Sequence, residues 1–199
     1  MTSIEIRDKM YQIVSEKEEM LKRVSFVLVP WNYKNRGDVF VKSVNEDLCM
    51  QFKIDISDII LDSNIIMLKD YLDLSHVTGD DIIDAAIYNT ELRHPPKFDD
   101  FTPDPDFDFS LNILTNDTGV FGASVILYKN MYEKLSKYFK DFVIIPSSVH
   151  ELIILDSYNF DISSLSEIIK EVNRTVVSKE EILGTRPYKL LPSGELVIA

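Results

Sequence analysis

The sequence predicts an α+β protein with a mixed, largely antiparallel sheet and helices packed against it. Two apolar runs, Val120–Tyr128 and Phe142–Leu155, flank a short helical pattern, and only Pro146-Ser147-Ser148 interrupts the second run. Hairpins that alternate with helices produce sheets of this kind. We therefore expect the order β-β-α-β-β-α in the C-terminal half, followed by a short hairpin.

The N-terminal part predicts one helix and several strands. Thr2 and Glu5 have the spacing of a capping box, and apolar residues then recur at helical spacing. The expected elements are a helix over about 4–22, a strand over Val24–Val29, a loop over Trp31–Asp38, a strand over Asp47–Ile56 and one or two strands within Ile59–Leu68. Thr78 and Asp81 predict the start of a further helix that runs to about Thr90.

The His94-Pro95-Pro96 sequence predicts the end of that helix, because proline lacks a backbone donor and restricts the preceding residue. The following residues are rich in proline and aspartate, so we expect a linker over 94–107. The chain would then consist of an N-terminal α/β lobe, 1–93, and a C-terminal α+β lobe, 108–199. One continuous domain is the alternative.

The C-terminal part has sharper patterns. The expected elements are a strand over Phe107–Leu114, a turn at Thr115–Gly119, a central strand over Val120–Tyr128, a helix from Asn130, strands over Phe142–Ile145 and Val149–Leu155, a helix capped by Ser164, a helical turn from Ser178 and a hairpin within Leu190–Ile198. Val120–Tyr128 is apolar at successive positions, which is typical of a strand covered on both faces.

Composition excludes several classes of function. The chain has 199 residues and a formal net charge of −12, so its field repels phosphate backbones and we expect no nucleic-acid partner. Cys49 is the single cysteine, and the chain has three scattered histidines, so we expect neither a disulfide nor a metal site. Neither a Walker loop nor a dinucleotide fingerprint occurs, so we expect no cofactor.

The sequence also predicts no membrane segment. No apolar run approaches the roughly 20 residues that span a bilayer. The charged first residues, Met1–Arg7, lack the apolar core of a signal peptide. We therefore expect a cytoplasmic protein.

Two pieces of sequence together resemble one family. They are Val77-Thr78-Gly79-Asp80-Asp81-Ile82-Ile83 with Ala85-Ala86 and Asn89-Thr90, and Leu114-Thr115-Asn116 with Gly119-Val120-Phe121-Gly122-Ala123 and Ile144-Ile145-Pro146-Ser147-Ser148-Val149-His150-Glu151-Leu152-Ile153. In this order and spacing they resemble an uncharacterised protein family of gut clostridia, domain of unknown function 5688. The resemblance covers residues 60–185 and implies a common origin and fold. It brings no activity with it.

Ser148, His150 and Glu151 are the candidate catalytic residues, because a hydroxyl, an imidazole and a carboxylate occur close together. On a strand, however, His150 and Glu151 point to opposite faces, and no nucleophile elbow surrounds Ser148. Structural roles in a turn and a strand are therefore favoured over catalysis. A buried, hydrogen-bonded His150 would favour a binding module, and an imidazole that opens into a pocket would favour an enzyme.

Two further clusters of residues could bind a partner or an ion. Trp31, Tyr33 and Arg36 are candidate binding residues, since loop aromatics beside arginine often anchor protein partners; their alternative role is to close over the core. An aspartate cluster could bind a hard cation but lacks the glycine and distal glutamate of a calcium loop, which favours a solvated linker. Its members are Asp99, Asp100, Asp104, Asp106 and Asp108.

The function predicted from these observations is a non-enzymatic protein-interaction or regulatory module. The alternative is a hydrolase or transferase whose site gathers Ser148, His150 and Glu151 with the Thr115–Gly119 loop. An acidic mimic of nucleic acid ranks last, because the sequence contains only one acidic cluster.

Overall fold

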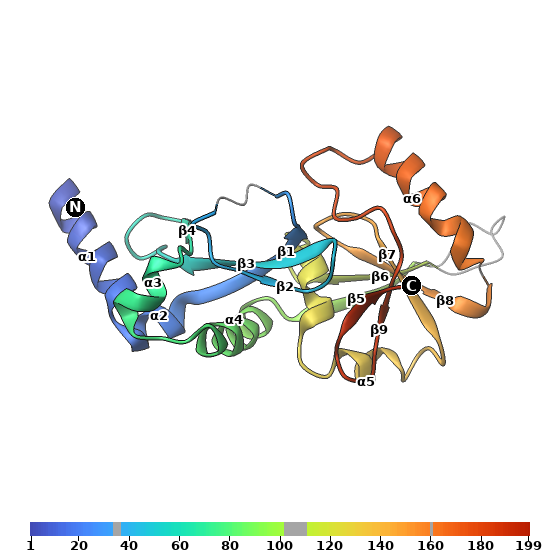
Figure 1. Cartoon of the computed structure of the whole chain (residues 1–199), viewed down its shortest axis with the longest axis horizontal. Coiled ribbons are helices and arrows are strands. Elements are labelled where there is room, and N and C mark those ends of the chain that lie inside the picture. The colour runs from blue at the N-terminus through green and yellow to red at the C-terminus, as the bar shows by residue number, and fades with distance from the viewer. Residues whose placement is uncertain (34–36, 102–110, 160) are drawn as a thin grey trace. The chain divides into compact units, whose positions relative to one another are not determined.

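The computed structural model describes residues 1–33, 37–101, 111–159 and 161–199 (Figure 1). Its helices and antiparallel sheets confirm the α+β class. Contacts along the chain group the residues into two compact units. The N-terminal unit consists of Met1–Val27, Lys34–Lys42 and Met50–Arg93, and the C-terminal unit of Leu28–Tyr33, Ser43–Cys49 and His94–Ala199.

The first 93 residues form helices and one four-stranded sheet. The elements are α1 (Ser3–Ser15), α2 (Lys17–Arg23), β1 (Val24–Pro30), β2 (Val41–Ser43), β3 (Leu48–Asp55), β4 (Asn64–Ile66), α3 (Asp70–Ser75) and α4 (Gly79–Arg93). The sheet order is β1-β3-β2, and β4 also pairs with β3. None of the described helices is long and apolar enough to span a membrane.

Local capping chemistry fixes both long helices of the N-terminal unit. The Thr2 hydroxyl accepts from the Glu5 N–H, and the Glu5 carboxylate accepts from the Thr2 N–H at 2.7 Å, as predicted. Thr78 and Asp81 make the same exchange at the start of α4. The single helix predicted over 4–22 is wrong: Glu16 has extended dihedral angles, and they divide it into α1 and α2.

The C-terminal unit is built on a six-stranded sheet of order β10-β9-β7-β8-β6-β5, in which every described pair is antiparallel. Its elements are β5 (Pro96–Phe101), β6 (Leu111–Asn116), the 3-10 helix η1 (Gly122–Leu127), α5 (Met131–Leu135), β7 (Phe142–Pro146), β8 (Leu152–Asp156), the 3-10 helix η2 (Ser157–Asn159), α6 (Ile162–Thr175), β9 (Tyr188–Leu190) and β10 (Leu196–Ile198).

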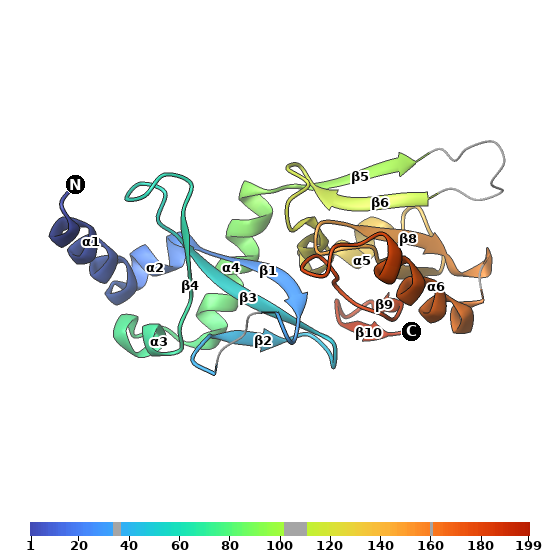
Figure 2. The same ribbon diagram turned by 90° about the horizontal axis from the view of Figure 1, so that it is seen from above.

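The two faces of this sheet are covered by different helices (Figures 1 and 2). On one face, here called the α6 face, Val143 and Leu155 pack against Leu165 and Ile169 of α6. On the other, here called the α5 face, Leu114 of β6 lies beside α5. Successive side chains of a strand point to opposite faces, so one antiparallel pair, β7 and β8, supplies core residues to both.

The predicted strand over Val120–Tyr128 is wrong, because Gly122–Leu127 form η1. Phe121 takes a left-handed conformation with φ of 51° and turns the chain into η1. Residues 122–126 are all buried. A short apolar run marks burial on all sides, and hydrophobicity alone does not separate a buried strand from a buried helical turn.

Part of the predicted 94–107 linker is a strand. Pro96–Phe101 form β5, which pairs with β6 along its whole length, while 102–107 lie outside the described residues. β5 is at the edge of the sheet, where a proline at the first strand position needs no ladder donor. The separation into lobes 1–93 and 108–199 stays a prediction.

Three smaller expectations also differ from the structure. β8 begins at Leu152, so Val149–Glu151 precede the strand. Asp161 caps α6 in place of Ser164, with its side chain accepting from the Ser163 N–H. Residues 178–181 form a turn without a helix.

Candidate functional site

The 146–151 segment is a tight connection between β7 and β8. Its backbone bonds both within the segment and to a distant one: the Ser148 N–H donates to the Glu151 carbonyl at 3.2 Å, and the Val149 N–H donates to the Glu181 carbonyl at 2.8 Å. The Ser148 hydroxyl accepts from the His150 N–H at 3.1 Å. This serine therefore satisfies the backbone of the turn, which is a common role for serine.

Both ring nitrogens of His150 face protein groups. Nδ1 accepts from the Phe121 N–H at 3.2 Å, and Nε2 lies 3.6 Å from the Glu181 carboxylate. A nitrogen that accepts has no proton, so the neutral ring carries its proton on Nε2. The imidazole is one-third exposed, and its ring lies 5.7 Å from the Phe121 ring. His150 thus anchors the start of η1 to the β7–β8 connection.

The three candidate catalytic side chains take separate partners. The Glu151 carboxylate accepts from the Ser147 hydroxyl at 3.0 Å. Among the described residues, no side-chain hydrogen bond joins Ser148 to His150 or His150 to Glu151. General-base catalysis by His150 would need an imidazole nitrogen directed at the nucleophile. In this arrangement Nδ1 is already occupied by a backbone donor.

The Thr115–Gly119 turn does contact this segment, through a side chain that bonds to its backbone. The Thr115 hydroxyl donates to the His150 carbonyl at 2.8 Å. The Asn116 side chain donates to the Val120 carbonyl at 2.9 Å and accepts from the Thr118 N–H at 3.1 Å. These bonds order the loop that leads into η1.

Gly122 lies at the point of closest approach. A Cβ atom there would overlap the Thr115 hydroxyl and the His150 carbonyl oxygen, and it would lie 2.8 Å from the Asn116 nitrogen. Three chain segments therefore meet at one glycine. These segments pack so closely that no space is left for a substrate at this point.

The predicted binding aromatics are only partly accessible. Trp31 is 40% exposed, and its indole N–H donates to the Asn45 carbonyl at 3.0 Å. The Tyr33 ring meets the Phe121 ring edge-on, with centroids 6.4 Å apart. Arg36 lies outside the described residues. Their role as a binding site stays a prediction.

One ion-paired network was missed by the sequence reasoning. The Arg186 guanidinium donates to both Asp47 oxygens, at 2.6 and 3.0 Å, and lowers the pKa of Asp47 below its ordinary value. Burial raises the pKa of the neighbouring Tyr188 phenol, which donates to the same carboxylate at 3.2 Å. More than 130 residues separate the partners in sequence, so no local pattern could reveal them.

Metal ligands do not gather in the described part of the chain. No group of three or more His, Cys, Asp or Glu side chains is placed there to hold an ion. Asp104, Asp106 and Asp108 of the acidic cluster lie outside the described residues.

An apolar hollow of the C-terminal unit was also missed. It lies between α6 and the β7–β8 pair, has a volume of about 350 Å³, and is here called the α6 groove. Its lining is almost entirely apolar. The residues are Ile145, Pro146, Ser147, Ile153, Leu155, Leu165, Ile168, Ile169, Val172 and Asn173.

Helix α6 has more apolar positions than its contact with the sheet buries. Leu165 and Ile169 are buried, whereas Ile168 is 56% exposed and Val172 is 43% exposed. Val176, just beyond the helix, is 77% exposed and continues this second row. The helical spacing of all five residues was visible in the sequence. A second apolar stripe beside the first was the signal that could have indicated the groove.

Comparison with known proteins gives a family and no activity. No curated protein and no solved structure matches the chain. A family model described as "Family of unknown function (DUF5688)" matches residues 5–190. The match confirms the resemblance to domain of unknown function 5688 and extends it beyond residues 60–185. The chain therefore belongs to the family of unknown function DUF5688.

Proposed function

We propose that this protein is a non-enzymatic binding module that holds an apolar segment of a protein partner in the α6 groove. The observation that carries the proposal is the open apolar groove beside a helix with a second, exposed apolar row. Amphipathic segments of partners bind in grooves of this kind through apolar side chains at helical spacing.

The chemistry of the lining favours an apolar guest. None of the ten lining residues is charged, and the two polar ones are Ser147 and Asn173. The Ser147 hydroxyl is already bonded to Glu151, and the Asn173 amide donates to the Gly184 carbonyl at 2.8 Å. A guest would therefore be held by burial of apolar area, at about 25 cal/mol per Å².

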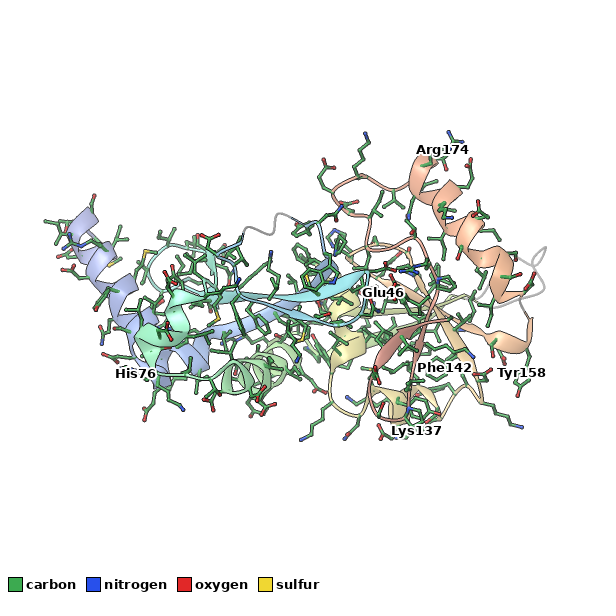
Figure 3. All side chains as sticks on the ribbon, in the orientation of Figure 1. Glu46, His76, Lys137, Phe142, Tyr158 and Arg174 are labelled. Atoms are coloured by element: carbon green, nitrogen blue, oxygen red, sulfur yellow. The ribbon has the colours of Figure 1, made fainter. Side chains whose placement is uncertain are left out.

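The charges of α6 lie away from the groove. Lys170 pairs with Glu167 at 2.8 Å, and Arg174 pairs with Glu171 at 2.6 Å. Figure 3 labels Arg174 near the end of α6. An apolar strip bordered by paired charges has the composition of a protein-binding surface with a polar rim. The net charge of −12 supports a protein partner over a nucleic acid.

The surroundings of the candidate catalytic residues support the same proposal. His150 is hydrogen-bonded to backbone and does not line the groove. Ser148 and Glu151 likewise bond within the turn. A structural role for all three agrees with a binding module. The hydrolase or transferase alternative would need one of them placed as a general base, and their hydrogen bonds do not support that.

The test is a binding experiment with two matched glutamine variants of α6. Partners retained by the tagged full-length chain from a cell lysate are identified, and each is then titrated against the purified protein by calorimetry. Ile168→Gln should weaken a groove partner several-fold to about tenfold, because a partner would cover only the exposed 56% of this side chain and so gain about half of the roughly 1.5–3 kcal/mol of full burial. Lys170→Gln, on the charged side of the same helix, should leave affinity unchanged.

Two results would overturn the proposal. One is a partner that binds the wild type and Ile168→Gln with equal affinity, since the groove would then be irrelevant to it. The other is a lysate from which no protein is retained by the wild type at stoichiometric level.

A further inference from the structure

The α6 groove has room for the side chains of a helical guest but not for its backbone. The volume of the groove is about 350 Å³. An α-helix is about 10–12 Å across with its side chains and rises 5.4 Å per turn, so three turns occupy more than about 1,000 Å³. A helical guest must therefore lie over the groove, insert one row of side chains and keep its flanking residues at the rim.

The floor of the groove is part of the core, whereas its rim is exposed. Leu155, Leu165 and Ile169 are 6%, 5% and 4% exposed. Ile168 and Val172 are 56% and 43% exposed, and side chains four positions apart on a helix are neighbours. The apolar row at the rim is therefore the surface that a guest would cover.

Acidic side chains border this apolar row. The Glu151 carboxylate accepts from the hydroxyl of Ser147, which lines the groove. Glu171 follows Ile168 by three positions on α6, a spacing that makes the two side chains neighbours on the helix surface. Asp161 caps the start of the same helix. A guest would thus meet carboxylates on the strand side and on the helix side of the groove.

The acids around the groove outnumber the bases after every strand of the sheet is counted. Residues 141–199, which include α6 and four of the six strands, contain nine acidic and five basic side chains. Strand β5 has two aspartates and one lysine, and β6 has no charge, which gives a net charge of −5. The four lysines of residues 129–140 belong to the segment around α5, which covers the other face. The excess therefore remains although individual acids, such as Glu171, are paired.

We propose that the guest of the α6 groove is a basic amphipathic helix, with apolar side chains at i, i+4 and i+7 in the groove and lysines or arginines facing the rim. The inference rests on the proposed function and names the chemistry of the partner. The groove supplies apolar contact for one face of such a helix. The net excess of acid attracts the opposite charge of its flanks and speeds their encounter.

The same charge disfavours the other molecules that could cover an apolar groove. A second copy of this chain carries the same net charge of −12, which opposes self-association. An anionic membrane surface repels an acidic rim for the same reason. A basic segment of a partner protein is the occupant that the surroundings of the groove attract.

The probes are three synthetic peptides of equal length, with leucine at the same helical positions and lysine, glutamine or glutamate on the polar face. These three residues have similar helix propensities, so the peptides differ mainly in charge. Each peptide is titrated into the full chain with isotope-labelled isoleucine and valine methyl groups. The lysine peptide should shift the Ile168 and Val172 signals and bind about tenfold more tightly than the glutamine peptide at low salt. The glutamate peptide should bind most weakly.

Salt and a rim variant test the role of charge. At 1 M salt the Debye length falls to about 3 Å, so the advantage of the lysine peptide should shrink to about twofold or less. The double variant Glu151→Gln, Asp161→Asn removes two rim charges and keeps an oxygen acceptor for the Ser147 hydroxyl and the Ser163 N–H. It should weaken the lysine peptide about fivefold and leave the affinity of the glutamine peptide unchanged.

The matched control is the double variant Glu133→Gln, Glu195→Gln, which changes the net charge by the same amount. Glu133 and Gly194, the neighbour of Glu195, line a small hollow beside α5, and neither glutamate lines the α6 groove. The control should bind the lysine peptide within about twofold of the wild type. Ile168→Gln should weaken all three peptides, because they share the apolar contact.

Equal affinity of the lysine and glutamine peptides at low salt, with the Ile168 signal shifted by both, would overturn the basic partner and leave the groove as a binding site. A rim variant that binds the lysine peptide as well as the control variant does would have the same meaning. If no peptide shifts the Ile168 or Val172 signal at millimolar concentration, the inference and the proposed function both fail.

Discussion

The two faces of the six-stranded sheet use the same strands but present different surfaces. On the α6 face, one amphipathic helix contacts the sheet through Leu165 and Ile169 and leaves an open apolar groove beside it. On the α5 face, Leu114 packs beside α5, and at the Thr115 end of β6 the 3-10 helix η1 is buried and hydrogen-bonded to the β7–β8 connection. The difference shows that one pair of strands can border an open groove on one face and a closed core on the other, because its alternate side chains point to opposite faces.

The largest loss of stability is expected from a substitution at Gly122, where η1 packs most tightly against its neighbours. Gly122→Ala should cost about 3 kcal/mol or more of unfolding free energy, because overpacking here meets backbone atoms and the Thr115 hydroxyl. Chemical denaturation of the variant and the wild type measures this difference in unfolding free energy. Gly37→Ala is the control, since no atom lies within 4 Å of a Cβ there. Equal stability of the two variants would show that the Thr115 and His150 segments do not pack closely against Gly122.

A smaller loss is expected on the α6 face. Leu165→Ala removes a buried anchor of α6 and should cost about 2–4 kcal/mol, with the lower end favoured because the groove already borders the site. Val176→Ala, at a 77% exposed position, should change stability by less than about 0.5 kcal/mol. If both variants unfold at the same denaturant concentration, α6 is not anchored as described.

A test at His150 can separate a structural role from a catalytic one, because another side chain can also accept the Phe121 N–H. His150→Ala leaves the Phe121 N–H without its acceptor and should cost about 1–3 kcal/mol. His150→Asn places an amide oxygen near the position of Nδ1 and should recover part of that loss in a thermal melt. If His150 acts as a structural acceptor, the wild type should be most stable, the asparagine variant intermediate and the alanine variant least stable. An alanine variant as stable as the wild type would contradict this role.

The smallest effect is a dependence on pH at Asp47. Arg186 lowers the folded-state pKa of Asp47, so the stabilisation is full above the unfolded value of about 3.9 and is lost as pH falls through the lowered one. In thermal melts, Arg186→Gln should be destabilised most at neutral pH, with the difference from wild type shrinking below about pH 4. Arg174→Gln, which removes an exposed pair on α6, should show no such convergence. A difference that stays constant with pH would argue against this pairing.

Some features that depend on neighbouring residues were predictable from the sequence, although Ser164 does not cap α6 and Ser178 does not start a helix. The capping pairs of α1 and α4 were correctly placed because each bond joins residues three positions apart. The α+β class followed from alternating apolar runs and helical patterns. Boundaries shifted where a single residue departs from regular geometry, as Glu16 does between α1 and α2.

Features that depend on distant contacts were not predictable. The sequence predicts a strand where η1 lies, because hydrophobicity indicates that these residues are buried without indicating their backbone conformation. The bond from Phe121 to His150 spans 29 positions, and a sequence contains no distance between them. The α6 groove was not predicted for the same reason. The sequence shows five apolar positions at helical spacing, but it does not show which of them the sheet covers.

The strand order also has a consequence for how the chain folds. β7 and β8 are joined by a short connection, whereas Asn112 of β6 and Ile154 of β8 are 42 positions apart, and β9 reaches β7 across a similar stretch that contains α6. Closing a short loop loses the least chain entropy, so the central hairpin should form first and template its neighbours on either side. Pulsed hydrogen exchange during refolding should protect the amides of 143–155 before those of β6 or β9, and simultaneous protection would indicate a single concerted step.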